Sequence, residues 1–262
     1  RVGPLENDAV NECWIADRDR FSYEALNGDE RLTTPMIKQG GAWHAVDWQT
    51  ALEYVAKGLR QISGEFGAKS VGALVSPHST LEELQLATQL MRGLGSPNID
   101  HRLRNADFSA ATSVRYLGMP IAALSELQSV LVVGSNLRKD HPLFALRVRH
   151  AVRRGAALNA IGSGQEDWAM PIENRVAVPP GQWISSMVSV ALAVAAAKSV
   201  SAPFAGEITD AARLIAASLL SGERRAILLG NGAAHHSQAS SLLSVAQWIG
   251  DQTGAAVGYL TE

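Results

Sequence analysis

Short, uninterrupted apolar runs alternate with longer segments of helical period through most of this chain. The runs predict strands at residues 71–75, 129–133, 157–161, 175–178, 225–229 and 256–260. The longer segments repeat apolar residues every three or four positions and predict helices at 79–92, 142–154, 183–198, 206–220 and 236–253. Strands alternating with helices of this length indicate βαβ units. Because the strand runs are continuously apolar, both faces of the sheet are expected to be buried. The sequence therefore predicts an α/β fold with Rossmann-like sub-domains and mostly parallel sheets.

The first 67 residues follow a different pattern. Residues 11–31 are rich in charged and aromatic side chains. A helix is predicted at 48–62, because apolar residues recur there at helical spacing directly after Asp47, a suitable N-cap. A short strand is predicted at 42–46, after a glycine turn.

These differences suggest two regions. We expect a first region at residues 1–67 and a Rossmann-like α/β region at 68–262, truncated at both ends. The sequence leaves open whether the second region divides again, into about 68–180 and 181–262. In the second region, Ser79 is expected to cap a helix, with Glu82 completing a capping box.

Composition narrows the class of protein. Hydrophobic residues make up 47% of the chain and charged residues 18%, which is typical of a globular fold rather than of a disordered chain. The net charge of −2 argues against nucleic acid as the main partner. The single cysteine, Cys13, cannot form an internal disulfide, a four-cysteine iron–sulfur cluster or a cysteine-rich zinc site.

No segment has the pattern of a signal peptide or a membrane anchor. The N-terminus carries mixed charge and lacks an apolar h-region. The longest apolar stretch, 184–197, is about 14 residues long and falls short of the roughly 20 residues that cross a bilayer. We expect a segment of a longer soluble polypeptide without direct membrane insertion.

Two glycine-containing turns are the strongest candidates for ligand binding. They are Gly134-Ser135-Asn136 and Gly230-Asn231-Gly232. Each follows a predicted strand, and ligands of open α/β sheets bind at the carboxyl ends of strands, where helix N–H groups favour phosphate. Neither turn matches the spaced dinucleotide motif or a P-loop, so ordinary strand-to-helix turns are the favoured interpretation.

A run of basic residues is the second candidate. It comprises Arg138, Lys139, His141, Arg147, Arg149, His150, Arg153 and Arg154. Such a run can bind a phosphate, an anionic lipid or an acidic partner. The favoured alternative is a solvated helix face whose last-turn arginines complement the helix dipole.

The remaining polar residues do not form a recognisable catalytic set. His235 and His236 are adjacent and point in different directions on a helix, so capping or packing is favoured over metal binding. No nucleophile elbow precedes a helix. We therefore expect no catalytic and no metal-binding residue.

The N-terminal segment resembles a known superfamily. Residues 10–23 and 31–37 are similar to the end of the iron–sulfur subdomain of molybdopterin oxidoreductases. In that superfamily the last cysteine of the motif binds a [4Fe–4S] cluster, and here Ala16 stands at its place. Arg18 and Asp19 replace the usual lysine and glycine. The resemblance implies that no cluster is bound through this motif.

Within the superfamily the chain is similar to the family of G subunits of bacterial NADH-quinone oxidoreductases, respiratory complex I. Residues 11–23, 134–142 and 229–236 carry this likeness. It implies a part in electron transfer from NADH to quinone, in the peripheral arm on the cytoplasmic side of the bacterial inner membrane. The implied partners are other complex I subunits, with NADH and quinone handled by the whole complex. Iron–sulfur clusters are expected in a preceding N-terminal part of the full subunit.

For this segment itself the resemblance implies a structural and assembly domain without a cofactor. The vestigial nucleotide loops would be those at Gly134, Ser135 and Asn136 and at Gly230 and Asn231. The alternative is a segment of a molybdopterin guanine dinucleotide-dependent oxidoreductase. A third, weaker alternative is an isolated nucleotide-binding module.

Overall fold

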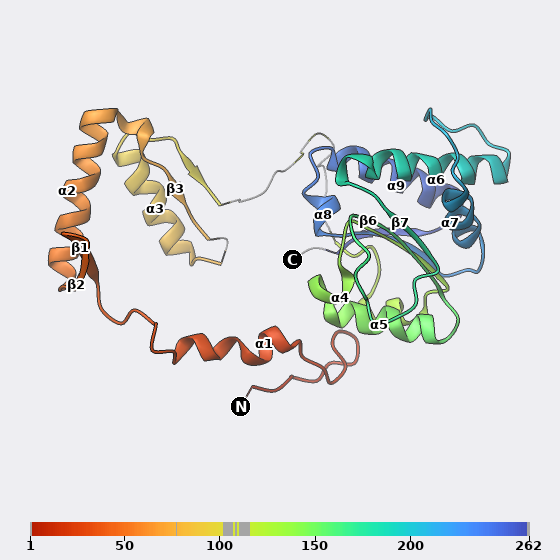
Figure 1. Ribbon diagram of the computed structural model, residues 1–262, viewed down its shortest axis with the longest axis horizontal. Helices are drawn as coiled ribbons and strands as arrows, with labels where there is room; N and C mark the ends of the chain where they lie inside the picture. The colour runs from red at the N-terminus through yellow and green to blue at the C-terminus, as the bar shows by residue number, and fades with distance from the viewer. Residues whose placement is uncertain (1, 77, 102–106, 108, 110–115, 261–262) are drawn as a thin grey trace. The chain divides into compact units, whose positions relative to one another are not determined.

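The chain forms two compact units in a computed structural model that describes residues 2–76, 78–101, 107, 109 and 116–260 (Figure 1). One unit, here called the sheet unit, comprises Arg1–Phe21 and Asn105–Glu262. The other, the small unit, comprises Ser22–Arg104. The division at residues 67 and 68 that the sequence suggested stays a prediction.

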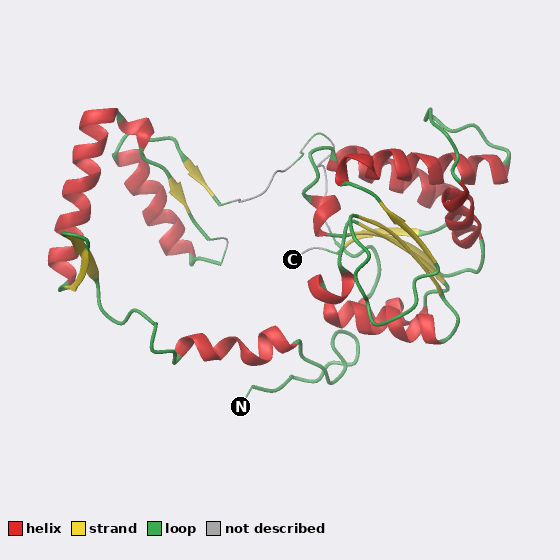
Figure 2. Ribbon diagram, viewed as in Figure 1, coloured by secondary structure: helices red, strands yellow, loops and turns green. Residues whose placement is uncertain are grey.

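A parallel sheet of five strands forms the centre of the sheet unit (Figure 2). Its strands are β5 (Ser129–Val133), β6 (Ala157–Gly162), β7 (Asn174–Ala177), β8 (Arg225–Leu229) and β9 (Ala256–Tyr259). They lie in the order β7-β6-β5-β8-β9, and every neighbouring pair is parallel. The predicted α/β fold with a mostly parallel sheet is confirmed.

Helices cover both faces of this sheet. On one face lie η3 (Ile121–Glu126), α4 (Leu137–Asp140) and α5 (Pro142–Arg153); on the other lie α6 (Trp183–Lys198), α7 (Asp210–Leu220) and α9 (Ala239–Thr253). Side chains of β5 alternate between the two faces: Val130 and Val132 pack toward α5, whereas Leu131 and Val133 pack toward α6. This burial on both faces explains why the strands could be predicted as uninterrupted apolar runs.

Two predicted helices begin later than expected. The helix predicted at 206–220 begins at Asp210, because Thr209 caps it by accepting a hydrogen bond from the N–H of Ala212 at 3.2 Å. The helix predicted at 236–253 begins at Ala239, after a separate short helix, α8 (Asn231–Ala234). Both differences arise from local structure at the helix N-terminus, which apolar spacing does not report.

The segment Pro180–Lys198, which joins η4 (Pro180–Gln182) to α6, is the most apolar helix among the described residues. With 19 residues and a mean hydropathy of 1.3, it is long and apolar enough to cross a membrane by length and composition alone. Met187, Val190 and Val194 are nevertheless buried in the core of the sheet unit. This packing is that of a core helix.

The small unit contains a hairpin, two helices and a short parallel strand pair. The hairpin strands are β1 (Met36–Gln39) and β2 (Ala42–Ala45), and the parallel pair is β3 (Ala73–Leu74) with β4 (Ile99–Asp100). The helices are α2 (Trp48–Phe66) and α3 (Leu81–Gly93), with short 3₁₀ helices at η1 (Ser22–Leu26) and η2 (Ala68–Ser70). The Asp47 carboxylate accepts a hydrogen bond from the N–H of Thr50 at 2.8 Å, which confirms the predicted N-cap of α2.

The capping box of α3 lies one residue after the predicted one. Thr80, not Ser79, is the N-cap: its hydroxyl accepts from the N–H of Glu83, and the Glu83 carboxylate accepts from the N–H of Thr80 at 2.9 Å. Ser79 and Glu82 show the same spacing as Thr80 and Glu83, so the spacing alone could not choose between the two registers.

We expect Thr80→Ala to lower the free energy of unfolding of the small unit by about 1 kcal/mol, because an orphan N–H of α3 loses its acceptor. The matched variant Ser79→Ala should change it by less than about 0.5 kcal/mol. Urea denaturation followed by circular dichroism measures both. An equal loss in the two variants would contradict the observed register.

Candidate functional site

The two glycine turns meet at the centre of the sheet. β5 and β8 are neighbours, and the chain continues from β5 to β6 on one side and from β8 to β9 on the other. Ligands of open α/β sheets bind at such a switch point, outside the carboxyl ends of the strands. The turn that begins at Gly134 follows β5, and the turn that begins at Gly230 follows β8. The structure thus brings together the two turns that the sequence singled out.

These turns contact each other through their backbones. The N–H of Gly232 donates to the carbonyl oxygen of Gly134, and the N–H of Gly230 donates to that of Val133, both at 2.8 Å. A Cβ atom at Gly230 would lie 2.2 Å from the Cβ of Ser135. Only glycine allows the two turns to come this close. The lack of a side chain at Gly230 thus serves a contact between two backbone segments of the protein.

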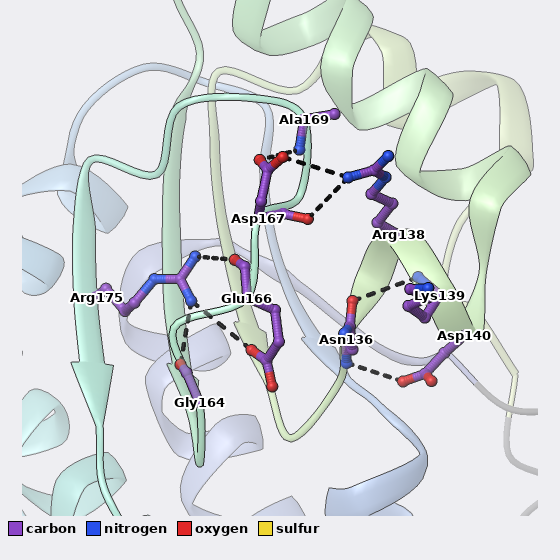
Figure 3. A network of polar contacts seen from close by, with 9 residues as sticks. All are labelled: Asn136, Arg138, Lys139, Asp140, Gly164, Glu166, Asp167, Ala169 and Arg175. Carbon is purple, nitrogen blue, oxygen red and sulfur yellow. Dashed lines mark hydrogen bonds and ion pairs between the residues drawn. The ribbon is translucent and has the colours of Figure 1, made fainter.

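The donors of the first turn are engaged by an acidic side chain. The hydroxyl of Ser135 donates to the carboxylate of Asp140 at 3.0 Å. The N–H of Asn136 donates to the same carboxylate at 2.9 Å (Figure 3). Asn136 in turn caps α4 by accepting from the N–H of Lys139. A phosphate at this turn would need the same donors and would meet a negative charge of like sign. The turn as it stands does not fit a phosphate group.

The loop that follows β6 is held at the same edge of the sheet by two arginines (Figure 3). Arg175 donates to the carbonyl oxygens of Gly164 and Glu166, at 3.1 Å and 2.9 Å. Arg138 forms an ion pair with Asp167 at 3.3 Å, and both side chains are more than half exposed. Exposed pairs contribute at most about 1 kcal/mol, so Arg175 is the principal anchor of this loop.

A second carboxylate lies at the N-terminus of α9. Asp107 accepts a hydrogen bond from the N–H of Ser240 at 2.9 Å, and from the hydroxyl and N–H of Ser109 at 2.6 Å and 3.0 Å. These bonds, the Ser109 hydroxyl first, hold the pKa of Asp107 well below its ordinary range. Here too an acidic side chain of the protein occupies a position that favours an anion.

The lowered pKa of Asp107 predicts a defined pH dependence. A carboxyl whose pKa is lower in the folded state stabilises the fold above its unfolded pKa of about 3.9, and this contribution is lost as the pH falls through the folded pKa. We expect Asp107→Asn to melt at a lower temperature than the wild type at pH 7 and the two melting temperatures to converge in acid. Carboxyl NMR titration should show Asp107 ionised below pH 3.9, and Ser109→Ala should raise its pKa; an ordinary titration would contradict the assignment.

The basic run does not form one continuous surface. Arg147 is buried and forms an ion pair with Glu12 at 3.3 Å. It also donates to the carbonyl oxygens of Asp8 at 2.6 Å and Val10 at 3.3 Å. The expectation that Arg147 belongs to a basic surface for a phosphate, an anionic lipid or an acidic partner is therefore wrong, because its guanidinium is used inside the protein. Arg153, in the last turn of α5, is exposed as expected for a dipole-complementing residue.

His236 packs and caps, as the sequence suggested. Its Nδ1 accepts a hydrogen bond from the N–H of Gln238 at 3.0 Å, and its Nε2 lies 3.1 Å from the carbonyl oxygen of Pro180. Its ring centroid is 5.9 Å from that of Trp183. Among the described residues, no group of three or more His, Cys, Asp and Glu side chains is placed to hold a metal ion.

The position expected for a cluster ligand is apolar. Ala16 is buried and lines a small cavity of about 160 Å³ together with His141 and Phe144, whose rings are stacked. Cys13, three residues before it, is exposed. Iron–sulfur clusters are held by thiolates. A methyl group at Ala16 supplies no such ligand, so this position does not fit a cluster.

The sequence of this chain is similar to those of known proteins. The family model of molybdopterin oxidoreductases matches residues 31–257. The G subunit of the NADH-quinone oxidoreductase of Rickettsia felis is 31% identical over 166 residues, which cover 63% of this chain and 24% of the relative. A putative formate dehydrogenase of Staphylococcus haemolyticus is 28% identical over 158 residues, covering 58% of this chain and 16% of the relative. The chain thus spans a quarter or less of the length of these relatives.

The fold of this chain is also similar to that of a protein of known structure. The chain superimposes with a TM-score of 0.51 on a chain of the formyltransferase/hydrolase complex of Methylorubrum extorquens, with 18% identity. The match covers 87% of this chain and 60% of that one. This likeness concerns the fold alone.

Proposed function

Because this chain belongs to the molybdopterin oxidoreductase family, we propose that it is part of the G subunit of an NADH-quinone oxidoreductase, respiratory complex I. The whole subunit takes part in electron transfer from NADH to quinone. This segment acts as a structural and assembly domain and carries no catalytic residue. The similarity to the G subunit of Rickettsia felis over 63% of the chain supports the assignment.

The observation that carries the structural role is the Asp140 carboxylate at the switch point. It accepts hydrogen bonds from the Ser135 hydroxyl and the Asn136 N–H, the donors that a nucleotide phosphate would otherwise use. The buried methyl group of Ala16 adds support, since a cluster needs a thiolate at the equivalent position. We therefore propose that this segment binds neither a molybdopterin cofactor nor an iron–sulfur cluster.

The proposed partners are other subunits of complex I, in its peripheral arm on the cytoplasmic side of a bacterial inner membrane. NADH and quinone are handled by the whole complex, and the iron–sulfur clusters of the subunit lie in a part of it that precedes this segment. No nucleic acid and no direct insertion into the bilayer are part of this proposal.

Metal and phosphorus analysis of the purified chain tests the structural role. We expect less than about 0.1 equivalent of molybdenum, iron or bound nucleotide phosphorus, because the donors are engaged internally. Asp140→Asn serves as the matched variant, since it removes the negative charge with little change in shape. One equivalent of molybdenum or a cluster absorption band in the wild type would overturn the proposal.

A second candidate is a segment of a molybdopterin guanine dinucleotide-dependent oxidoreductase. The similarity to a putative formate dehydrogenase over 58% of the chain favours it. It requires the cofactor phosphates to displace Asp140 from the first turn. Molybdenum and phosphorus assays on the full-length protein distinguish the two, because only this second candidate predicts stoichiometric amounts of both.

A further inference from the structure

A cavity of about 760 Å³ lies in the sheet unit, among β7, the first half of α6 and the segment that leads into α7. Val176 and Val178 line it from the β7 side, and Ile184 and Val188 line it from α6. Cavities of this size accommodate several side chains or a small organic molecule. It is separate from the glycine turns of the candidate site, none of whose residues line it.

The hydroxyl groups of this cavity are already paired with one another or with the backbone. Ser189 accepts a hydrogen bond from the N–H of Thr209 at 3.0 Å, and Ser185 and Ser186 both donate to the carbonyl oxygen of Gln182 at 2.9 Å. Small-molecule sites usually orient their ligand with a few convergent polar groups. The hydroxyl groups here are engaged, so the cavity fits aliphatic groups better than a polar small molecule.

Next to the cavity, the backbone of β7 is unpaired on one side. Among the described residues β7 pairs with β6 alone. The N–H of Val178 donates to the carbonyl oxygen of Gly162 in β6 at 2.8 Å, so the alternate residues Arg175 and Ala177 direct their backbone N–H and C=O groups away from β6. No hydrogen bond joins these backbone groups to another described residue. An unpaired edge of this kind can pair with another extended chain.

One charged residue lines the cavity. Glu207 is exposed at its rim, and no described basic residue forms an ion pair with it. A cationic side chain on the occupant would complement this carboxylate. The recognition features are thus an unpaired strand edge, aliphatic pockets on one side of it and a single negative charge.

We propose that this edge binds an extended segment of a neighbouring subunit, which adds to the sheet as a strand beside β7. Its alternate aliphatic side chains enter the cavity beside Val176 and Val178, and a lysine or arginine lies against Glu207. The inference rests on the proposed function, since it takes the neighbour to be a subunit of the same complex. Main-chain hydrogen bonds supply the affinity in such an arrangement, and the pockets supply the specificity.

Photo-crosslinking in the assembled complex tests this inference. A benzoylphenylalanine replaces the exposed Gln182, which lines the cavity, in the full-length subunit, and a second version replaces Glu223, away from the cavity, as the control position. Ala177→Pro removes only an outward N–H, whereas Ala177→Thr keeps it and is the matched variant. Glu207→Lys reverses the rim charge, and Glu223→Lys makes the same change elsewhere.

We expect a crosslink from position 182 to one neighbouring subunit, within an extended aliphatic peptide that contains a basic residue. Ala177→Pro and Glu207→Lys should each reduce its yield on the order of tenfold, as expected for the loss of a central interface contact. Ala177→Thr and Glu223→Lys should leave it unchanged, and thermal melting shows that each variant is folded.

The inference is overturned if the complex assembles and position 182 crosslinks to nothing, to the same polypeptide, to a second copy or to a small molecule. It is also overturned if the crosslink survives Ala177→Pro. If no complex I subunit copurifies with the protein at all, the proposed function fails and the inference fails with it. Copurification thus separates the two kinds of failure.

Discussion

Arg147→Met is expected to lower the free energy of unfolding of the sheet unit by about 3 kcal/mol. The guanidinium is buried in α5 and holds the loop of residues 7–12 through its ion pair with Glu12 and its bonds to two backbone carbonyls. Methionine fills a similar volume and offers no donor. Glu12 and these carbonyl groups therefore lose their partner at a site that water reaches poorly.

Urea denaturation measures this loss, and limited proteolysis shows where it acts. We expect cleavage within residues 5–14 to become faster in Arg147→Met, because the loop is no longer held against α5. Arg149→Met is the control, since Arg149 lies two residues away, is only half-buried and forms no ion pair with a described residue. Equal stability of the two variants would show that the Arg147 contacts contribute nothing.

Gly230→Ala is expected to cost about 3 kcal/mol, because the added methyl group has no space between the two turns. A Cβ there would lie 2.2 Å from the Cβ of Ser135 and 2.8 Å from the carbonyl oxygen of Gly134. The φ of Gly230 is −83°, which any residue adopts, so the cost is steric and not conformational.

Gly162→Ala provides the matched control. Gly162 ends β6, at the same edge of the sheet, and a Cβ there meets no atom within 4 Å. We expect its melting temperature to remain within the range of neutral surface substitutions, which change stability by about 0.5 kcal/mol or less. If Gly230→Ala proved as stable as Gly162→Ala, the close backbone contact between the turns would be refuted.

The contact between the two turns indicates what their glycines do in this chain. A dinucleotide site at a switch point needs glycines so that the backbone can approach phosphates. Here the glycines let two turns approach each other, and Asp140 supplies the anion. Glycine in these turns thus serves packing within the protein, which agrees with the proposed structural role.

The sequence located both turns and missed the residue that occupies the first of them. By sequence alone, Asp140 is only the acidic residue within a basic run. Its distance of four residues from Asn136 is a usable signal, since a carboxylate at this spacing can reach back to N–H groups at the start of a short helix. The capping of α3 was missed by one residue, because Ser79 and Thr80 offer the same chemistry one position apart.

The sequence by itself determined the strands of the five-stranded sheet, the principal helices and the α/β class. β5 and β8 have the predicted bounds. Strands that are buried on both faces must be continuously apolar, and few other elements show such a run of residues. Only the tertiary structure decided the strand order, the meeting of the two turns and the burial of Arg147. The partners Asp8, Val10 and Glu12 of Arg147 lie more than 130 residues away in the sequence. The charge of a residue and the spacing of apolar residues around it are local properties of the sequence. The burial of its side chain depends instead on which distant segment of the chain packs over it.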